Sequence, residues 1–164
     1  MPFQGKAFSR YPILLIYSGM RNNRYSGHTV TQLSVHLVWV TTYRYAVLTG
    51  EIQLRTRELI QQICDAQDVR ILKGVVSHDH VHIHVSRPPN LSESELVRRI
   101  KGRSGRKLLL EYPQLKKRYW GGHLWAIGFG AWSTGNLTQE MINEYLEHHR
   151  ERPNHEDDET FILE

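Results

Sequence analysis

The sequence has almost no cysteine and no long hydrophobic run. Cys64 is the only cysteine among 164 residues, which excludes an intramolecular disulfide and a zinc site built from several thiolates. The apolar run Ile13–Tyr17 is shorter than the roughly 7–15 residues of a signal-peptide core, and no stretch approaches the roughly 18 apolar residues of a membrane span. We therefore expect a cytoplasmic protein that does not associate with membranes.

Acidic residues are scarce in one segment and concentrated in another. Residues 98–118 contain nine Lys or Arg and one acid, whereas residues 151–164 contain six acids and one base. Tyr112, Tyr119 and Trp120 lie within or beside the basic segment, where cations would follow a phosphate backbone and aromatic rings would stack on unpaired bases. This combination favours single-stranded nucleic acid over a merely solvated surface. The candidate DNA-binding residues are Arg98, Arg99, Lys101, Arg103, Arg106, Lys107, Lys116, Lys117 and Arg118.

The periodicity of apolar residues predicts an α+β fold. The pattern predicts strands at about 29–40, 69–77, 81–86 and 124–132, and helices at about 51–67, 92–111 and 138–151. Strand, helix, two strands, helix and strand is the order of a ferredoxin-like or RRM-like sandwich, an antiparallel sheet with helices on one face. The last helix is an addition to that fold. We expect one domain at 28–151, an N-terminal extension outside the core at 1–27 and an acidic tail at 152–164.

Four histidines alternate along one predicted strand. His78, His80, His82 and His84 occupy every second position, so their side chains project from one face. Neighbouring imidazoles on that face can share a cation, but regular strand geometry does not let all four reach one ion. The pattern predicts a metal site built on one pair of histidines, with a third ligand from elsewhere in the chain. A polar strand face exposed to solvent is the alternative.

The last predicted helix carries a tyrosine beside a candidate metal ligand. Met141, Tyr145 and His149 are four residues apart and share one helix face. A tyrosinate can attack phosphorus and form a covalent phosphotyrosine, and a nearby divalent cation would favour the ionised phenol. The alternative is that Tyr145 is an ordinary half-buried helix aromatic.

Four segments together resemble the single-tyrosine HUH transposases of the insertion-sequence 200/605 family. They are VHLVWVTTYRYAVL at 35–48, DHVHIHVS at 79–86, the stretch 95–125 with KGRSGR and WGGHLW, and NLTQEMINEYLEHH at 136–149. The short HVH motif alone is weak, but these segments in this order and spacing are highly specific. The resemblance covers about residues 29–150, and makes 28–151 the expected catalytic domain.

The resemblance implies a homodimeric DNA transposase that recognises single-stranded hairpins near the ends of its own mobile element. The metal histidines of the family fall on His80 and His82, and its nucleophile falls on Tyr145. The family places a glutamine at the third metal ligand, where this sequence has His149. The implied cofactor is Mg²⁺ or Mn²⁺, and the implied active sites are shared between subunits through the last helix. The pair His82 and His84 fits the same histidine pattern and stays an alternative register.

Two other functions fit parts of the pattern. A domesticated relative that nicks hairpin repeats, or a replication-initiating nickase, would use the same chemistry in a different biology. A non-enzymatic RNA-binding module would share the fold but would stack bases on aromatic residues of its central strands. The predicted strand face carries histidines instead, which counts against the binding module.

Overall fold

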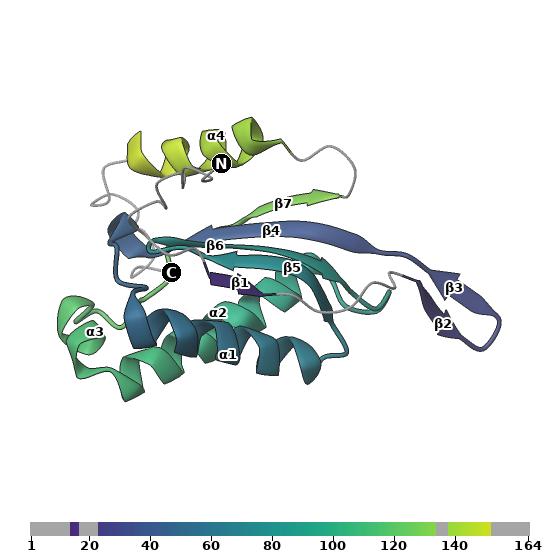
Figure 1. Cartoon of the computed structure of the whole chain (residues 1–164), viewed down its shortest axis with the longest axis horizontal. Helices are drawn as coiled ribbons and strands as arrows, with labels where there is room; N and C mark the ends of the chain where they lie inside the picture. The colour runs from purple at the N-terminus through teal and green to yellow at the C-terminus, as the bar shows by residue number, and fades with distance from the viewer. Residues whose placement is uncertain (1–13, 17–22, 134–137, 152–164) are drawn as a thin grey trace, which may run out of the picture.

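The computed structural model describes residues 14–16, 23–133 and 138–151. An antiparallel sheet forms the middle layer, with α1 and α2 on one face and α4 on the other (Figure 1). The described elements are β1 (Leu14–Ile16), β2 (Arg24–Ser26), β3 (Thr29–Thr31), β4 (Ser34–Val40), the 3-10 helix η1 (Thr42–Arg44), α1 (Gly50–Asp65), β5 (Arg70–Val76), β6 (His80–Ser86), α2 (Glu93–Glu111), α3 (Pro113–Arg118), β7 (Gly130–Ser133) and α4 (Gln139–Glu151).

The strand order of the main sheet confirms the ferredoxin-like topology. The order is β1-β5-β6-β4-β7, with every neighbouring pair antiparallel. The parallel strands β4 and β5 flank β6 and are joined by α1, while β6 and β7 flank β4 and are joined by α2. Two split β-α-β units are thus interleaved, which is the pattern predicted from the order of elements.

The alternation of β4 and β6 divides the sheet into two chemically different faces. Odd-numbered residues of both strands, such as Leu37 and Ile83, are fully buried in the main core beneath α1 and α2. Even-numbered residues lie on the face that α4 covers, and on β6 the first three of these are histidines. Successive side chains of a strand point to opposite faces, so one stretch of sequence supplies both the buried side chains of the core and the row of histidines.

Hydroxyl side chains cap the first turns of two helices. The hydroxyl of Ser92 accepts a hydrogen bond from the Glu95 backbone N–H at 3.2 Å, at the start of α2. The hydroxyl of Thr138 accepts one from Met141 at 3.3 Å, at the start of α4. Each cap satisfies an N–H that has no partner within its own helix.

The structure departs from the predicted elements in four places. The strand predicted at 29–40 is two strands, because β3 pairs with β2 in a hairpin separate from the main sheet. The strand predicted at 124–132 is reduced to β7, and α3 was not predicted at all. The predicted extension at 1–27 is not wholly outside the core, because Leu14–Ile16 adds a strand to the edge of β5. The acidic tail at 152–164 lies outside the described residues. No helix in the described part of the chain is both long and apolar enough to span a membrane.

Candidate active site

The predicted metal histidines share one face of β6. His80, His82 and His84 alternate with the buried Val81 and Ile83, and each is half-buried beneath the layer that contains α4. Their cross-strand partners on β4 are Val40, Val38 and His36 in that order. The predicted alternation is therefore confirmed for these three histidines, whereas His78 lies in the bend before β6. It brings the three to the same side of the sheet as the helix that carries Tyr145.

Asp79 fixes the orientation of His80. The Nδ1 of His80 lies 2.8 Å from Oδ1 of Asp79, a geometry in which Nδ1–H donates to the carboxylate and Nε2 carries the lone pair. Burial disfavours the Asp79 carboxylate, but hydrogen bonds from His80 and Arg44 outweigh that effect and lower its pKa to about 2. A carboxylate behind a histidine is the usual second partner of a metal-binding imidazole.

His36 joins His82 and His84 in a compact imidazole cluster. The Nδ1 of His36 lies 3.1 Å from Nε2 of His82, and the rings of His36 and His84 stack with centroids 4.0 Å apart. Burial, followed by repulsion between neighbouring imidazoles, lowers the pKa values of His36 and His82 to about 4. Neutral imidazoles have the lone pair that a metal ligand needs, so His82 is ready to bind a cation near neutral pH.

The described residues contain no group of three or more His, Cys, Asp or Glu that converges on one point as a metal site. His80 and His82 therefore form at most a two-residue set within the described side chains. His149, the predicted third ligand, falls on α4, but its side chain lies outside the described residues.

Helix α4 brings Tyr145 over the histidine face of its own chain. Ile142 and Leu146 of α4 pack with Val38 and Val40 of β4 in a second apolar cluster. Tyr145 lies at the edge of that cluster and meets the ring of Trp132 edge to face, with centroids 6.1 Å apart. Burial raises the pKa of the Tyr145 phenol above its ordinary value, so a nearby positive charge is needed to favour the tyrosinate.

A cavity of about 480 Å³ lies directly beside Tyr145. It is lined by Trp132, Met141, Glu144, Tyr145, Glu147 and His148. A volume of this order accommodates a nucleotide. His148, the neighbour of the predicted ligand His149, is exposed and lies on this cavity.

Arg44 connects the metal histidines to α4. Its Nη2 lies 2.7 Å from Oδ2 of Asp79, and its Nη1 donates to the Leu146 carbonyl at 2.7 Å. Both Tyr43 and Arg44 have positive φ angles, 60° and 53°, which is an unfavourable conformation for residues other than glycine. The strained η1 turn thus places the largely buried Arg44 guanidinium between Asp79, which precedes β6, and helix α4.

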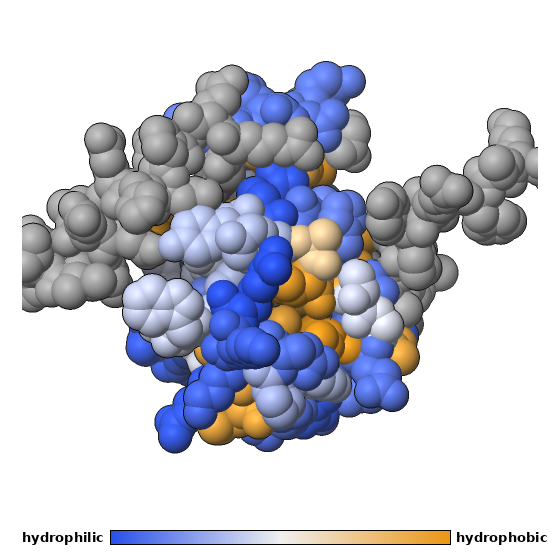
Figure 2. All heavy atoms as spheres, turned by 90° about the vertical axis from the view of Figure 1, so that its left-hand side faces the viewer, coloured by the Kyte–Doolittle hydropathy of each residue, from blue (hydrophilic) through white to orange (hydrophobic). Residues whose placement is uncertain are grey.

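The basic segment lies on the opposite side of the sheet from Tyr145. Its cations belong to α2 and α3, whereas α4 covers the histidine face (Figure 1). The view onto the α3 end shows hydrophilic side chains and residues of intermediate hydropathy around a hydrophobic patch (Figure 2). Arg118 lies 4.1 Å above the ring of Tyr45, and the Tyr119 hydroxyl donates to the Thr42 carbonyl, so α3 contacts the η1 turn. The η1 turn therefore lies between the basic surface and the Tyr145 site.

The predicted DNA-binding cations differ in their availability. Arg98 and Arg99 pair with Glu95, and the Lys101 ammonium donates to the carbonyls of Ala126 and Gly128 at 2.6 and 2.8 Å. Lys101 thus anchors the loop before β7, and its role in binding DNA stays a prediction. Six of the predicted cations are exposed and form no ion pair within the described part of the chain: Arg103, Arg106, Lys107, Lys116, Lys117 and Arg118, of which Arg118 lies over the Tyr45 ring.

Comparison with known proteins identifies the family. The family model of "Transposase IS200 like" proteins matches residues 29–149. The chain belongs to the IS200-like transposase family. It is 33% identical over 118 residues to the ISDra2 transposase TnpA of Deinococcus radiodurans, covering 72% of this chain and 84% of that protein. It is 27% identical over 132 residues to the transposase for insertion sequence element IS200 of Salmonella typhimurium, covering 80% of this chain and 86% of that protein.

A solved structure supports both the family and the fold. A crystal structure of a transposase from Deinococcus radiodurans superposes with a TM-score of 0.72 at 27% identity, covering 77% of this chain and 97% of that one. The matched range of the family model contains His80, His82, Tyr145 and His149. The transposase therefore carries its candidate site wholly within the region that defines the family.

Sequence reasoning missed three residues of this transposase site. His36 lies at an even position of β4, where the register with β6 places it opposite His84. Trp132 lies opposite His36 on β7, on the same face. Arg44 reaches the site from a turn whose strained backbone no pattern predicts. The sequence offered one indication of these residues. His36 is an even-numbered residue of the first predicted strand, where apolar and other side chains alternate.

Removing the Arg44 guanidinium should destabilise the transposase in a pH-dependent way. Arg44→Gln leaves a buried Asp79 carboxylate without its cation, so we expect the free energy of unfolding to fall by about 3 kcal/mol at neutral pH. Because the folded-state pKa of Asp79 is depressed, its stabilisation is present above the unfolded value near 4 and is lost as pH falls toward about 2. The deficit should therefore shrink below about pH 4 in urea unfolding.

The matched control for Arg44→Gln is the double variant with Asp79→Asn. It removes both charges, and we expect it to recover part of the stability that the single variant loses. Equal losses in the single and double variants would show that Arg44 acts through Leu146 alone.

Neutralising the free cations of α2 and α3 should flatten the salt dependence of DNA binding. With Arg103, Arg106, Lys107 and Lys116 changed to Gln, we expect weaker binding and a slope of log Kd against log salt reduced by roughly 0.7 for each phosphate that the variant no longer neutralises. Arg98→Gln is the control, since Arg98 is already paired with Glu95. An unchanged slope in the fourfold variant would make this surface a solvated face without a DNA role.

Proposed function

We propose that this transposase cuts and rejoins single-stranded hairpin DNA at the ends of its element through a 5′-phosphotyrosine intermediate. The observation that supports this most directly is the convergence of His80, His82 and Tyr145 on one face of the sheet. A cavity of about 480 Å³ beside Tyr145 leaves room for the scissile nucleotide.

The donor set suits a divalent cation, and we propose Mg²⁺ or Mn²⁺. Asp79 holds His80 with Nε2 carrying the lone pair, and burial keeps His82 neutral. His80 and His82 would hold the ion, with His149 as the third ligand, and the cation would supply Lewis acidity at the phosphate. His82 would exchange its contact with His36 for the metal, because both involve Nε2.

The bonds that form and break in the covalent step belong only to Tyr145 and the DNA. The Tyr145 oxygen loses its proton and bonds to phosphorus, and the bond from phosphorus to the 3′ oxygen breaks. This leaves a 5′-phosphotyrosine and a free 3′-hydroxyl. Attack by that hydroxyl, or by one from another strand, releases Tyr145 and restores a phosphodiester. The intermediate keeps the ester bond, so rejoining needs no external energy source.

We propose that the transposase acts as a homodimer. In this structure α4 packs on its own sheet, so each chain brings Tyr145 to its own histidines. The sharing of active sites that the family resemblance implies would need α4 to leave Val38 and Val40 for a second copy. Residues 134–137, which connect β7 to α4, lie outside the described residues.

A cleavage assay on single-stranded DNA tests this function. The probe is a hairpin oligonucleotide taken from the DNA that flanks the coding sequence, incubated with Mg²⁺ or Mn²⁺. We expect a covalent protein–DNA adduct that forms on the single strand, fails on the matched duplex and disappears when EDTA removes the metal. Cleavage that persists in EDTA would contradict the metal site, and hydrolysis without an adduct would contradict the nucleophile.

A further inference from the structure

Arg44 joins the residue behind His80 to the helix that carries Tyr145. Its Nε and Nη2 both donate to Oδ2 of Asp79, at 3.0 and 2.7 Å, while its Nη1 donates to the Leu146 carbonyl at 2.7 Å. The other oxygen of Asp79, Oδ1, is the one that holds His80. The side chains of Arg44 and Asp79 are only 11% and 7% exposed, so water competes little for these contacts. A chain of hydrogen bonds therefore runs from α4 through one guanidinium and one carboxylate to a proposed metal ligand.

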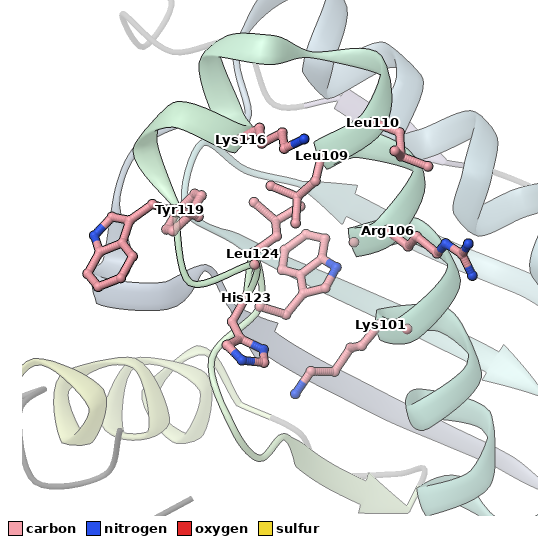
Figure 3. A pocket seen from close by; sticks show the side chains of 13 residues that line it. Lys101, Arg106, Leu109, Leu110, Lys116, Tyr119, His123 and Leu124 are labelled. Atoms are coloured by element: carbon pink, nitrogen blue, oxygen red, sulfur yellow. The ribbon is translucent and has the colours of Figure 1, made fainter. Parts of the chain in front are cut away.

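The turn that carries Arg44 is fixed by contacts of its backbone. The Thr41 N–H donates to the Asp79 carbonyl at 2.9 Å, which ties the turn to the residue before β6. Tyr119, which lines the cavity beside α3 in Figure 3, donates from its hydroxyl to the Thr42 carbonyl at 3.2 Å. Between these ties Arg44 keeps a φ of 53°, a conformation that a free turn would rarely adopt. The turn thus presents the guanidinium in a defined direction.

The apolar contacts of α4 hold it on the sheet without fixing where it lies along the sheet. Ile142 and Leu146 are buried, and they pack against Val38 and Val40 of β4. Burial of apolar surface is non-directional, so it does not by itself set the rotation of the helix or its shift along its axis. A hydrogen bond from a fixed donor to the Leu146 carbonyl is directional and does set them. Leu146 directly follows Tyr145, so this contact acts next to the phenol.

We propose that Arg44 is a positioning residue, which sets Tyr145 against His80 by holding a neighbour of each at the same time. Those neighbours are the Leu146 carbonyl on α4 and the Asp79 carboxylate behind His80. The proposal rests on the proposed function, because it needs Tyr145 to be the nucleophile and His80 to be a metal ligand. The positive charge of Arg44 has a second effect, since it opposes the burial that raises the pKa of the Tyr145 phenol.

Arg44→Lys separates the positioning role from the charge. Lysine keeps the positive charge that Asp79 needs, but one ammonium nitrogen cannot take the places of Nε, Nη1 and Nη2 at once. Because the charge pair with Asp79 is retained in part, this variant should unfold at a urea concentration closer to that of the wild type than Arg44→Gln does. The contact with α4 should be lost in both variants.

Arg87 supplies a control with the same pattern of contacts. Its Nε and Nη2 donate to Oε1 of Glu93, at 3.0 and 2.6 Å, and its Nη1 donates to the Leu91 carbonyl at 2.7 Å. Arg87 follows β6 at the end of the strand opposite to His80, and the groups that it binds lie outside the candidate active site. Arg87→Lys therefore removes equivalent hydrogen bonds without touching α4.

Two measurements on the full-length protein test the proposal. The first is hydrogen–deuterium exchange without metal, in which Arg44→Lys should raise the exchange rate of α4 amides about 10-fold or more and leave that of β5 amides unchanged. The second is single-turnover adduct formation on the flanking hairpin oligonucleotide with saturating Mn²⁺. The maximal rate of Arg44→Lys should fall on the order of 100-fold, the cost of an error of about 1 Å in a reacting group. The hairpin concentration at half-maximal rate should stay near that of the wild type, and Arg87→Lys should match the wild type in both measurements.

Each contrary result has its own meaning. A wild-type rate in Arg44→Lys would refute the positioning role and leave the proposed function standing, and a low rate in Arg44→Gln alone would then assign the effect to charge. A lower rate in Arg44→Lys with wild-type exchange in α4 would refute the link through Leu146. Equal losses of rate in Arg44→Lys and Arg87→Lys would reduce the effect to a general loss of stability. A wild type that forms no adduct would refute the proposed function and this proposal together.

Discussion

The Tyr145→Phe variant should form no covalent adduct with hairpin DNA while binding it as tightly as the wild type. The substitution removes only the hydroxyl, and the ring keeps its edge-to-face contact with Trp132. Because the nucleophile is removed, we expect the cleavage rate to fall by at least about 10⁴-fold. Single-turnover cleavage and a gel shift on the same hairpin measure the two quantities separately.

Tyr112→Phe is the matched control for this experiment. Tyr112 lies in the basic segment, and its hydroxyl makes only a long contact of 3.4 Å with the Glu51 carbonyl. We expect near wild-type cleavage from this variant. Residual adduct in Tyr145→Phe, or loss of adduct in Tyr112→Phe alone, would move the nucleophile to another tyrosine.

Truncating either proposed metal ligand should have the second-largest effect. His80→Ala and His82→Ala should each abolish metal-dependent cleavage, with a loss of at least about 100-fold. Among the described side chains only these two histidines are proposed to bind the cation, so each variant leaves a single one. Hairpin binding should persist, because the free cations of α2 and α3 lie across the sheet.

His84→Ala distinguishes the two possible registers of the histidine pair. His84 stacks on His36 and has no carboxylate partner comparable to Asp79 among the described residues, so we expect its loss to be tolerated. Tolerance of His80→Ala together with loss of activity in His84→Ala would assign the site to His82 and His84 instead.

Mixing Tyr145→Phe with the His80→Ala, His82→Ala double variant shows how the subunits share the chemistry. If α4 acts on its own sheet, as it packs here, no mixture cleaves. If α4 serves the partner subunit, heterodimers regain one intact site and about a quarter of the wild-type activity is expected by random pairing.

The sequence was sufficient to predict the elements whose periodicity is strong. The alternation of His80, His82 and His84 with buried aliphatics predicted both the strand and the face that it presents. The helix predicted at 92–111 begins within one residue of the start of α2, where Ser92 is the cap. These features depend on local chemistry, which short segments of sequence record directly.

Contacts between distant segments could not be read from the sequence. His36 reaches His82 only because β4 and β6 pair in one register, and Arg44 reaches Leu146 across 102 positions of sequence. Lys101 resembles a DNA contact in the sequence, yet the fold turns its ammonium to two loop carbonyls. The strand predicted at 124–132 is interrupted. Leu124 and Ala126 form backbone hydrogen bonds with Thr42 and Val40, but Lys101 then binds the loop carbonyls, and the regular strand begins only at Gly130.

Mapping the covalent adduct tests the central claim most directly. After reaction with hairpin DNA and nuclease digestion, the protein is cleaved into peptides and the modified residue is located by mass spectrometry. The account predicts a 5′-linked nucleotide on Tyr145, formed only when a divalent cation is present. A nucleotide on any other residue, or cleaved DNA with no modified peptide, would contradict it.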